Sequence, residues 1–430
     1  MSLLLSAAPA KASSPTPPKP PVLLGVTGSA TPPVKTLDPG LEQNLSRVQT
    51  AAAARSALGA YYDSAESEYV VVAPASGPGS ELTADDFADL GLPLRVEQSD
   101  YTQEQINAVT DDISQRDWDP AADQYSYASF FDIERGKTVL DSDAPPDVMA
   151  SLLDQYPGAI DYEQHQIQRN SNNRYNSDEL PLYGGAALVP NSDLIENKNA
   201  PMKCTSGFTV QAHTRDEFPG YDPAKSFMLT AGHCADVGQT LRNWTPQVGT
   251  NTVYGRVNDR ASYPSYDMEL LNTGVQPTYP FEGAFFVGEN DADDILLVGR
   301  DRDAGDPVTS SQDYCTSGAQ TFEYCDLKVY SDRAQLCQKG AACTSNLAAY
   351  RPADINAPLP AQPGDSGAPL YQRTDCEYQG SFFACAAIRG MHVAASGRFM
   401  FGVKWSTVAA GTPLGWDSIT VYSLFDIDDQ

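Results

Sequence analysis

All eight cysteines of this 430-residue chain lie between Cys204 and Cys385, and residues 1–203 contain none. Their number is even, and no CxxC pair of the kind that binds zinc or carries thioredoxin-like chemistry occurs. Four disulfides are therefore expected, although eight cysteines leave 105 possible connectivities. No metal site and no cofactor are expected. Because disulfides persist in oxidising compartments, the chain is predicted to be secreted.

The N-terminus carries only part of the signal that secretion needs. Met1–Ala12 has no basic start and a very short apolar run, whereas Ala10–Ala12 fits a small-x-small cleavage site. We interpret this segment as the end of a signal peptide whose beginning lies upstream of Met1. No stretch approaches the roughly 20 apolar residues that span a bilayer, so an integral membrane protein is not expected.

Composition limits the size and the partners of the folded units. The chain is longer than one hydrophobic core usually organises, and 41% hydrophobic against 20% charged residues indicate packed units. The net charge of −28 repels phosphate backbones and anionic headgroups, so neither nucleic acid nor a membrane is expected as a partner. Acidity also favours solubility in salty external media, so it does not identify a substrate.

The pattern along the chain predicts an N-terminal linker and a small mixed domain. Residues 1–43 are rich in Pro, Ala, Ser and Thr and are expected to stay extended. Residues 44–175 alternate short strands with amphipathic helices, and from Leu94 onward their order is the βαββαβ of a split βαβ sandwich. The Asn-rich segment Arg169–Asp178 is the expected exposed, cleavable boundary.

Residues 176–430 show a different pattern and are predicted to be all-β. Short apolar runs alternate with clusters of Gly, Pro, Asn and Asp, without a convincing amphipathic helix. Such runs include Phe227–Thr230, Ile295–Val298 and Phe399–Val403. Closed antiparallel barrels or a sandwich would accommodate them.

Two motifs in this part present side chains suited to nucleophilic catalysis. In Ser226–Cys234 (SFMLTAGHC), an apolar strand leads to His233, and an imidazole suits general-base work because its pKa lies near neutrality. In Pro363–Pro369 (PGDSGAP), Ser366 stands in a turn of small residues. There the amides of Gly364 and Ser366 can converge as an oxyanion hole.

A third motif supplies the acid. Tyr266–Leu271 (YDMELL) sets Asp267 at the start of an apolar strand, where a carboxylate can hold one imidazole tautomer. Glu269 and Asp259 are the alternative acids. Each motif alone has an ordinary structural explanation, but together they follow the order His, Asp, Ser. That is the chymotrypsin order, which differs from the order in subtilisins and α/β-hydrolases.

At these motifs the sequence resembles the chymotrypsin-like serine peptidases, and most of all the bacterial streptogrisin and α-lytic group, over about residues 182–423. Cys204–Val210 looks like that group's opening strand, and Ser418–Tyr422 like its closing strand. The resemblance implies two packed six-stranded barrels with the triad between them. It also implies the disulfides Cys204–Cys234 and Cys315–Cys325. Proximity in the sequence predicts the pairs Cys337–Cys343 and Cys376–Cys385.

Members of that group are made with an N-terminal pro-region that assists folding and is then removed. The resemblance therefore implies that residues 44–175 are a propeptide, which is a partner of the rest of the chain.

There are departures from the pattern: Ala368 replaces the usual second Gly after the nucleophile. Thr316 stands where relatives often place an arginine that partners the Asp before the serine, so what neutralises Asp365 is open. No Arg/Lys-Ile-Val-Gly-Gly activation site precedes Gly184.

The sequence thus predicts a secreted serine endopeptidase acting on proteins or peptides. Pro360 stands where trypsins place an Asp, so a preference for Arg or Lys is not expected. Gly390–Ala394 (GMHVA) resembles the pocket strand of glutamyl endopeptidases, which implies that His392 donates a hydrogen bond to Glu or Gln before the cleaved bond. A purely structural histidine is the alternative.

Two other functions are alternatives to this prediction. A catalytically silent homologue acting as a binding protein is the alternative from a different class, because folds outlive activities. An esterase would need the order Ser, acid, His, but only His392 follows Ser366, and it follows too soon for the intervening βα units.

Overall fold

A computed structural model describes most of the chain beyond the N-terminal linker. The described residues are 39–164, 182–196, 204–214, 226–244, 251–272, 281–287, 295–339, 342–378 and 381–423. The expected signal remnant and the expected boundary at Arg169–Asp178 lie outside these ranges. None of the helices in these ranges combines the length and the apolar composition needed to cross a bilayer.

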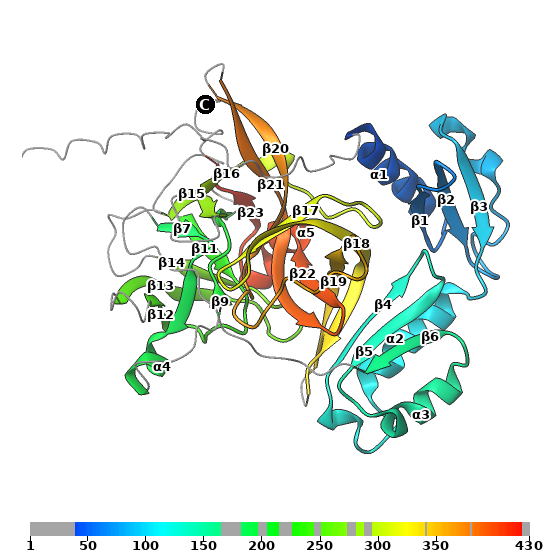
Figure 1. Cartoon of the computed structure of the whole chain (residues 1–430), viewed down its shortest axis with the longest axis horizontal. Coiled ribbons are helices and arrows are strands. Elements are labelled where there is room, and N and C mark those ends of the chain that lie inside the picture. Colours follow the sequence, from blue (N-terminus) through cyan, green and yellow to red (C-terminus); the bar gives the residue numbers. More distant parts are fainter. Residues whose placement is uncertain are drawn as a thin grey trace, which may run out of the picture. The chain divides into compact units, whose positions relative to one another are not determined.

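The C-terminal part contains a closed ring of six antiparallel strands, drawn in yellow and orange in Figure 1. Its members are β17 (Tyr314–Gly318), β18 (Phe322–Cys337), β19 (Cys343–Pro352), β20 (Pro369–Tyr378), β21 (Ser381–Ser396) and β22 (Phe399–Lys404). Hydrogen-bonded neighbours follow the order β17, β18, β19, β22, β21, β20 and return to β17. We call this the second ring.

A first ring, green in Figure 1, is formed by the preceding strands. They are β8 (Ala187–Pro190), β9 (Cys204–Thr205), β10 (Thr209–His213), β11 (Ser226–Thr230), β12 (Thr240–Trp244), β13 (Asn251–Arg260) and β14 (Glu269–Asn272). β9 and β10 are parts of one segment, 204–213, which pairs with β8 at its start and with β11 at its end. The segment therefore closes the ring through β14, β13 and β12.

Shorter elements extend the two rings. β23 (Ser418–Val421) adds to β10, and β16 (Ile295–Val298) adds to β21. The remaining elements here are β7 (Leu182–Gly184), α4 (Asn191–Glu196), β15 (Phe281–Phe286), η4 (Asp301–Asp303), α5 (Trp405–Ala409) and η5 (Thr412–Leu414). The predicted all-β pattern of this part is present in the strand pairing, and the helices within it are short.

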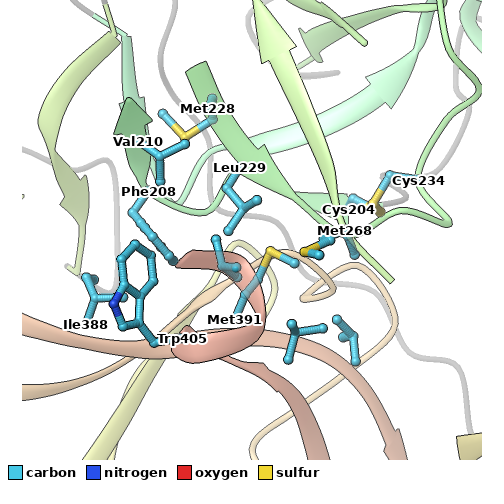
Figure 2. Packing of buried hydrophobic residues seen from close by; sticks show 14 of the residues in the cluster. Cys204, Phe208, Val210, Met228, Leu229, Cys234, Met268, Ile388, Met391 and Trp405 are labelled. Atoms are coloured by element: carbon cyan, nitrogen blue, oxygen red, sulfur yellow. A yellow bond between two sulfur atoms is a disulfide. The ribbon is translucent and has the colours of Figure 1, made fainter. Parts of the chain in front are cut away.

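One apolar core joins both rings (Figure 2). Phe208 of the first ring is fully buried, and its ring centroid lies 6.0 Å from that of Trp405 at the start of α5. Leu229 and Met391, also fully buried, belong to the same cluster. The two rings therefore share side-chain packing across their junction.

Residues 39–98 form a three-stranded unit with a helix that the sequence analysis missed. It comprises α1 (Pro39–Ala54), β1 (Gly59–Asp63), β2 (Glu68–Ala73), η1 (Ala84–Leu90) and β3 (Leu94–Gln98). The first turns of α1 fall within the stretch expected to be linker. The apolar residues Leu45, Val48 and Ala52 recur at helical spacing and are buried in its core.

Residues 102–164 contain the elements predicted there, but not the predicted sandwich. They are α2 (Gln103–Gln115), η2 (Ala122–Gln124), β4 (Tyr127–Asp132), β5 (Lys137–Ser142), α3 (Pro146–Gln155) and β6 (Ile160–Gln164). Thr102 and Gln105 form a capping box at the start of α2. The split βαβ sandwich is wrong because β3 pairs with β2 in a separate sheet, and the edge of β4 is taken by β18.

This β4–β18 pairing ties the N-terminal region to the second ring. Ser129, Ala128 and Tyr127 pair with Gln335, Leu336 and Cys337 at the far end of the long strand β18. At that end the Cys337–Cys343 disulfide closes the hairpin of β18 with β19.

The structure contains all four expected disulfides. The pairs are Cys204–Cys234, Cys315–Cys325, Cys337–Cys343 and Cys376–Cys385. The last two were predicted only from proximity in the sequence, and both are present. No free cysteine is left.

Replacing Phe208 tests the core that joins the rings. Phe208→Ala is expected to lower the free energy of unfolding by about 3–5 kcal/mol, because it removes buried surface and leaves a cavity. Val237, which is 61% exposed, provides the control, and Val237→Ala is expected to change stability by less than about 0.5 kcal/mol. Both are measured by urea unfolding, and similar losses in the two variants would contradict this assignment of the core.

Candidate active site

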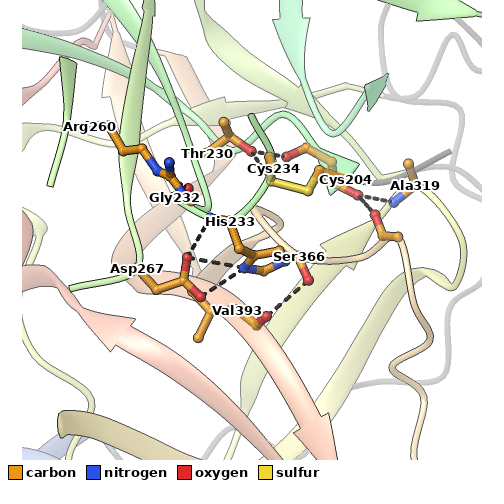
Figure 3. Close-up of a disulfide and its surroundings, with 12 residues drawn as sticks. Cys204, Thr230, Gly232, His233, Cys234, Arg260, Asp267, Ala319, Ser366 and Val393 are labelled. Carbon is orange, nitrogen blue, oxygen red and sulfur yellow. Dashed lines mark hydrogen bonds and ion pairs between the residues drawn. A yellow bond between two sulfur atoms is a disulfide. The ribbon is translucent and has the colours of Figure 1, made fainter. Parts of the chain in front are cut away.

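His233 follows β11 of the first ring, and bonds made by its two neighbours in sequence hold its backbone in place. Its neighbour Cys234 is bonded to Cys204 of β9, and the Cα atoms of that disulfide are 6.0 Å apart. Before it, the carbonyl of Gly232 accepts a hydrogen bond from Nε of Arg260. The His233 side chain is 27% exposed, and Figure 3 shows its imidazole between Asp267 and Ser366.

Asp267 lies directly before β14 and binds His233 through both carboxylate oxygens. Oδ2 is 2.8 Å and Oδ1 is 3.1 Å from Nδ1 of His233. Oδ1 also accepts from the backbone amide of His233 at 2.9 Å. The structure thus joins two residues that are 34 positions apart in sequence. The contact favours the tautomer in which Nδ1 carries the proton and donates it to Asp267. Nε2 is then unprotonated and can accept a proton.

Neither alternative acid occupies this place. Oδ2 of Asp259 accepts from Nε1 of Trp416 at 3.0 Å, away from the imidazole. Glu269 is fully buried, and burial raises its pKa well above the usual range.

The surroundings of His233 raise its pKa. Burial lowers it, but the charge of Asp267 and the hydrogen bond to that carboxylate raise it by more in total, and Arg260 opposes them weakly. The carboxylate of Asp267 therefore stabilises the protonated form of the imidazole.

Ser366 comes from the second ring, in the loop between β19 and β20. Figure 3 shows it beside His233 and Val393. Its hydroxyl donates to the carbonyl of Val393 in β21 at 2.9 Å. Within the described ranges no hydrogen bond joins Ser366 to His233, so rotation of the serine side chain is needed to bring the two together.

The loop around Ser366 is anchored by Thr205 of the first ring. The Thr205 amide donates to the carbonyl of Ser366 at 2.7 Å, and its hydroxyl donates to the carbonyl of Gly364 at 2.8 Å. Gly367 has a φ of +100°, and a Cβ there would lie 2.0 Å from the Thr205 carbonyl, so only glycine fits. With the carbonyls held, the amides of Gly364 and Ser366 find no acceptor among the described residues and are free to bind an anion.

Asp365 is buried, and no salt bridge to it is formed within the described ranges. Its carboxylate accepts hydrogen bonds from the amides of Gln320, Thr321 and Gln362 and from the hydroxyl of Thr321. Burial raises the pKa of Asp365 to about 6, although these hydrogen bonds lower it. The partner that the sequence left open is therefore a set of neutral donors.

His392 lies in β21, one residue before Val393. It is 2% exposed, and its Nδ1 lies 2.7 Å from Oη of Tyr350 in β19. Burial, with a smaller effect from His233, lowers the pKa of His392 to about 3, so its imidazole is neutral. Its carbonyl accepts from the amide of Gly367, which places it against the loop of Ser366.

Several residues of the site escaped the sequence analysis. Arg260 bonds Gly232 and also Asp236, and its guanidinium lies 5.1 Å from the ring centre of Tyr263. Tyr263 lies 6.3 Å from the imidazole of His233, between ring centres. Neither residue is part of a recognisable motif, and only their positions four and seven residues before Asp267 hinted at a role.

The sequence of the chain matches no family model and no curated protein. Among solved structures it is similar to a Nocardiopsis protease (NAPase), with 16% identity over 56% of this chain and 98% of the other, at a TM-score of 0.36. The MamO protease domain from Magnetospirillum magneticum shares 15% identity over 48% and 95%, at 0.26. An HRV-C 3C protein with rupintrivir shares 12% over 46% and 91%, at 0.23. Similarity this low leaves function to be inferred from the strand pairing and the site geometry.

Removing the charge of Asp267 tests the His233 contact. Asp267→Asn is expected to lower kcat/KM for peptide hydrolysis roughly 10³- to 10⁴-fold, because the imidazole loses the carboxylate that fixes its tautomer. The acid limb of the pH profile is expected to move to lower pH, since burial still lowers the pKa of His233 while the charge that raised it is gone. Asp259→Asn is the control. An unchanged acid limb in Asp267→Asn would contradict the contact.

Proposed function

We propose that this chain is a secreted serine endopeptidase of the chymotrypsin type, in which His233, Asp267 and Ser366 form the catalytic triad. The observation that carries the proposal is the Asp267–His233 pair of the first ring, with the hydroxyl of Ser366 presented beside it by the second ring. The two closed rings and the four disulfides support the class of fold and an oxidising compartment.

The mechanism follows from the roles of these groups. The Ser366 hydroxyl turns from the Val393 carbonyl to Nε2 of His233, which takes its proton as Oγ attacks the substrate carbonyl carbon. The oxyanion receives hydrogen bonds from the amides of Gly364 and Ser366. His233 then protonates the leaving amine as the C–N bond breaks. Water then attacks the ester carbonyl carbon and loses a proton to the same imidazole, and that proton passes to Oγ of Ser366 as the C–Oγ bond breaks.

The precursor form is part of the proposal. Residues 44–175, together with the preceding turn of α1, act as a pro-region that is released by cleavage in the Asn-rich boundary Arg169–Asp178. Its pairing through β4 with β18 supports a docked partner, and Arg116 of α2's C-cap adds a hydrogen bond from Nη2 to the carbonyl of Gln338 at 2.7 Å. Oη of Tyr263, beside His233, donates to Oε1 of the same Gln338 at 2.6 Å. Two residues, Gln338 and Tyr263, therefore lie between Arg116 of this region and His233.

Replacing the nucleophile tests the assignment directly. The secreted protein is expected to hydrolyse casein or a mixed peptide pool and to be labelled by a fluorophosphonate at Ser366. Ser366→Ala is expected to lose the label and to lower kcat at least roughly 10³-fold. Ser311→Ala, a change at a buried serine in the segment before β17, is the control. A folded wild-type protein that takes no label and cleaves nothing would favour the silent binding protein.

We propose in addition that His392 contributes to substrate selection. With Tyr350 donating to its Nδ1, the neutral ring keeps a proton on Nε2 that can be donated to a Glu or Gln side chain before the cleaved bond. His392→Leu is expected to lower kcat/KM for such peptides about tenfold relative to peptides with a bulky apolar residue there. A peptide-library profile of the wild type with only bulky apolar preference would exclude this role.

A further inference from the structure

Asp365, the residue before the nucleophile, is an anion buried without a positive partner. Its side chain is 2% exposed, and no salt bridge reaches it from the described part of the chain. Thr316, at the position where the resembling peptidases often carry an arginine, has a buried hydroxyl and no charge. A buried carboxylate is costly unless several hydrogen bonds stabilise its ionised form.

Those hydrogen bonds come mainly from the turn between β17 and β18, residues 318–321. Oδ1 of Asp365 accepts from the amides of Gln320 at 2.8 Å and Thr321 at 3.2 Å. Oδ2 accepts from the Thr321 hydroxyl at 2.9 Å and from the amide of Gln362, in its own loop, at 2.8 Å. Each oxygen is thereby given two donors, which is the arrangement that favours a carboxylate over a carboxylic acid.

The turn is shaped to receive this side chain. A Cβ at Gly318 would lie 2.0 Å from Oδ1 of Asp365, so the carboxylate occupies the space that any other residue would fill. The Cys315–Cys325 disulfide closes the hairpin that carries the turn. The amide of Ala319 donates to Oγ1 of Thr205 at 2.9 Å, and that hydroxyl in turn holds the carbonyl of Gly364.

We infer that the turn at residues 318–321, through Thr321 above all, is the positioning element of the oxyanion loop and takes the place of a cationic partner. This inference rests on the proposed peptidase function. Three consecutive amides, at 319, 320 and 321, hold the loop either directly or through Thr205. Because Asp365 joins Gly364 to Ser366, holding its side chain fixes the direction of the two amides that bind the oxyanion.

Because Asp365 can gain or lose a proton, the contact between the turn at residues 318–321 and the Ser366 loop depends on pH. Burial raises the pKa of Asp365 to about 6, so it is charged in neutral solution and protonated in mildly acidic solution. The titratable neighbours Tyr350 of β19 and His392 of β21 bond each other and are both neutral, because burial raises the pKa of the phenol and lowers that of the imidazole. On β18 and β20, Glu323 and Arg373 pair with each other.

A protonated Asp365 carries a hydrogen that points at groups which are themselves hydrogen-bond donors. Of these four groups, the backbone amides cannot accept that hydrogen, whereas the Thr321 hydroxyl can rotate and accept it. Thr321 therefore stabilises the carboxylate as a donor and is also the one group able to adapt when the proton arrives. Removing its hydroxyl is expected to raise the pKa of Asp365 further.

The test compares Thr321→Val with Thr321→Ser, which keeps the hydroxyl, and with Thr374→Val, a change at an exposed threonine of β20. At pH 8, Thr321→Val is expected to lower kcat about tenfold with KM changed less than about twofold, as for a lost hydrogen bond to a charged group. The deficit is expected to grow by roughly threefold or more at pH 6, where the variant is protonated first. Thr321→Ser and Thr374→Val are expected to match the wild type.

Thermal unfolding supplies a measurement that does not depend on activity. The hydroxyl stabilises the charged carboxylate, so the loss of Tm in Thr321→Val is expected to be larger at pH 8 than at pH 5. An equal loss of Tm at both pH values, or a Thr321→Ser as impaired as Thr321→Val, would overturn the inference. A wild type without peptidase activity would overturn the proposed function and leave the Tm comparison to decide on the turn.

Discussion

The arrangement of the site depends on the contact between Thr205 of the first ring and the loop of Ser366 in the second. The amide and the hydroxyl of Thr205 hold two carbonyls of that loop, and the adjoining Cys204 is bonded to Cys234, next to His233. A short covalent and hydrogen-bonded path therefore links His233 to Ser366. Glycine at 367 allows the two backbones to come this close. Without this junction, His233 and Ser366 would be carried on two separate rings.

Three acidic side chains near this junction have three different surroundings. Asp267 accepts hydrogen bonds from the imidazole and the backbone amide of His233, whereas Asp365 is surrounded by neutral donors. Glu269 begins β14, two residues after Asp267, and burial raises its pKa well above the usual range. One small region therefore holds the carboxylate that contacts His233, the carboxylate that anchors the Ser366 loop and a third, fully buried carboxyl group.

The sequence was sufficient for the residues with strong local patterns. His233, Asp267 and Ser366 each stand in a motif, and the order of the motifs led to the contact that the structure forms between His233 and Asp267. The strands and the capped helix α2 were predicted because their apolar periodicity is local.

What the sequence did not reveal depends on pairing between distant segments. Three of the four donors to Asp365 come from a turn 44 or 45 residues away, and a backbone amide leaves no signature in the amino-acid sequence. The split βαβ sandwich failed for a related reason: the order of elements was right, but partners of β3 and β4 are chosen by which strand edges meet in space. Helix α1 was missed because its first turns continue a Pro- and Ala-rich stretch.

The length of β18 has a consequence for how the N-terminal region is held. One strand serves both as a wall of the second ring and, at its far end, as the neighbour of β4, so the two regions share a continuous hydrogen-bonded sheet. Cutting the connection between residues 164 and 182 would leave these bonds intact and change only the effective concentration of the N-terminal region. Separation would then be governed by a dissociation constant and by dilution. Its departure would also expose an unpaired strand edge at Gln335–Cys337, a surface open to any other extended peptide.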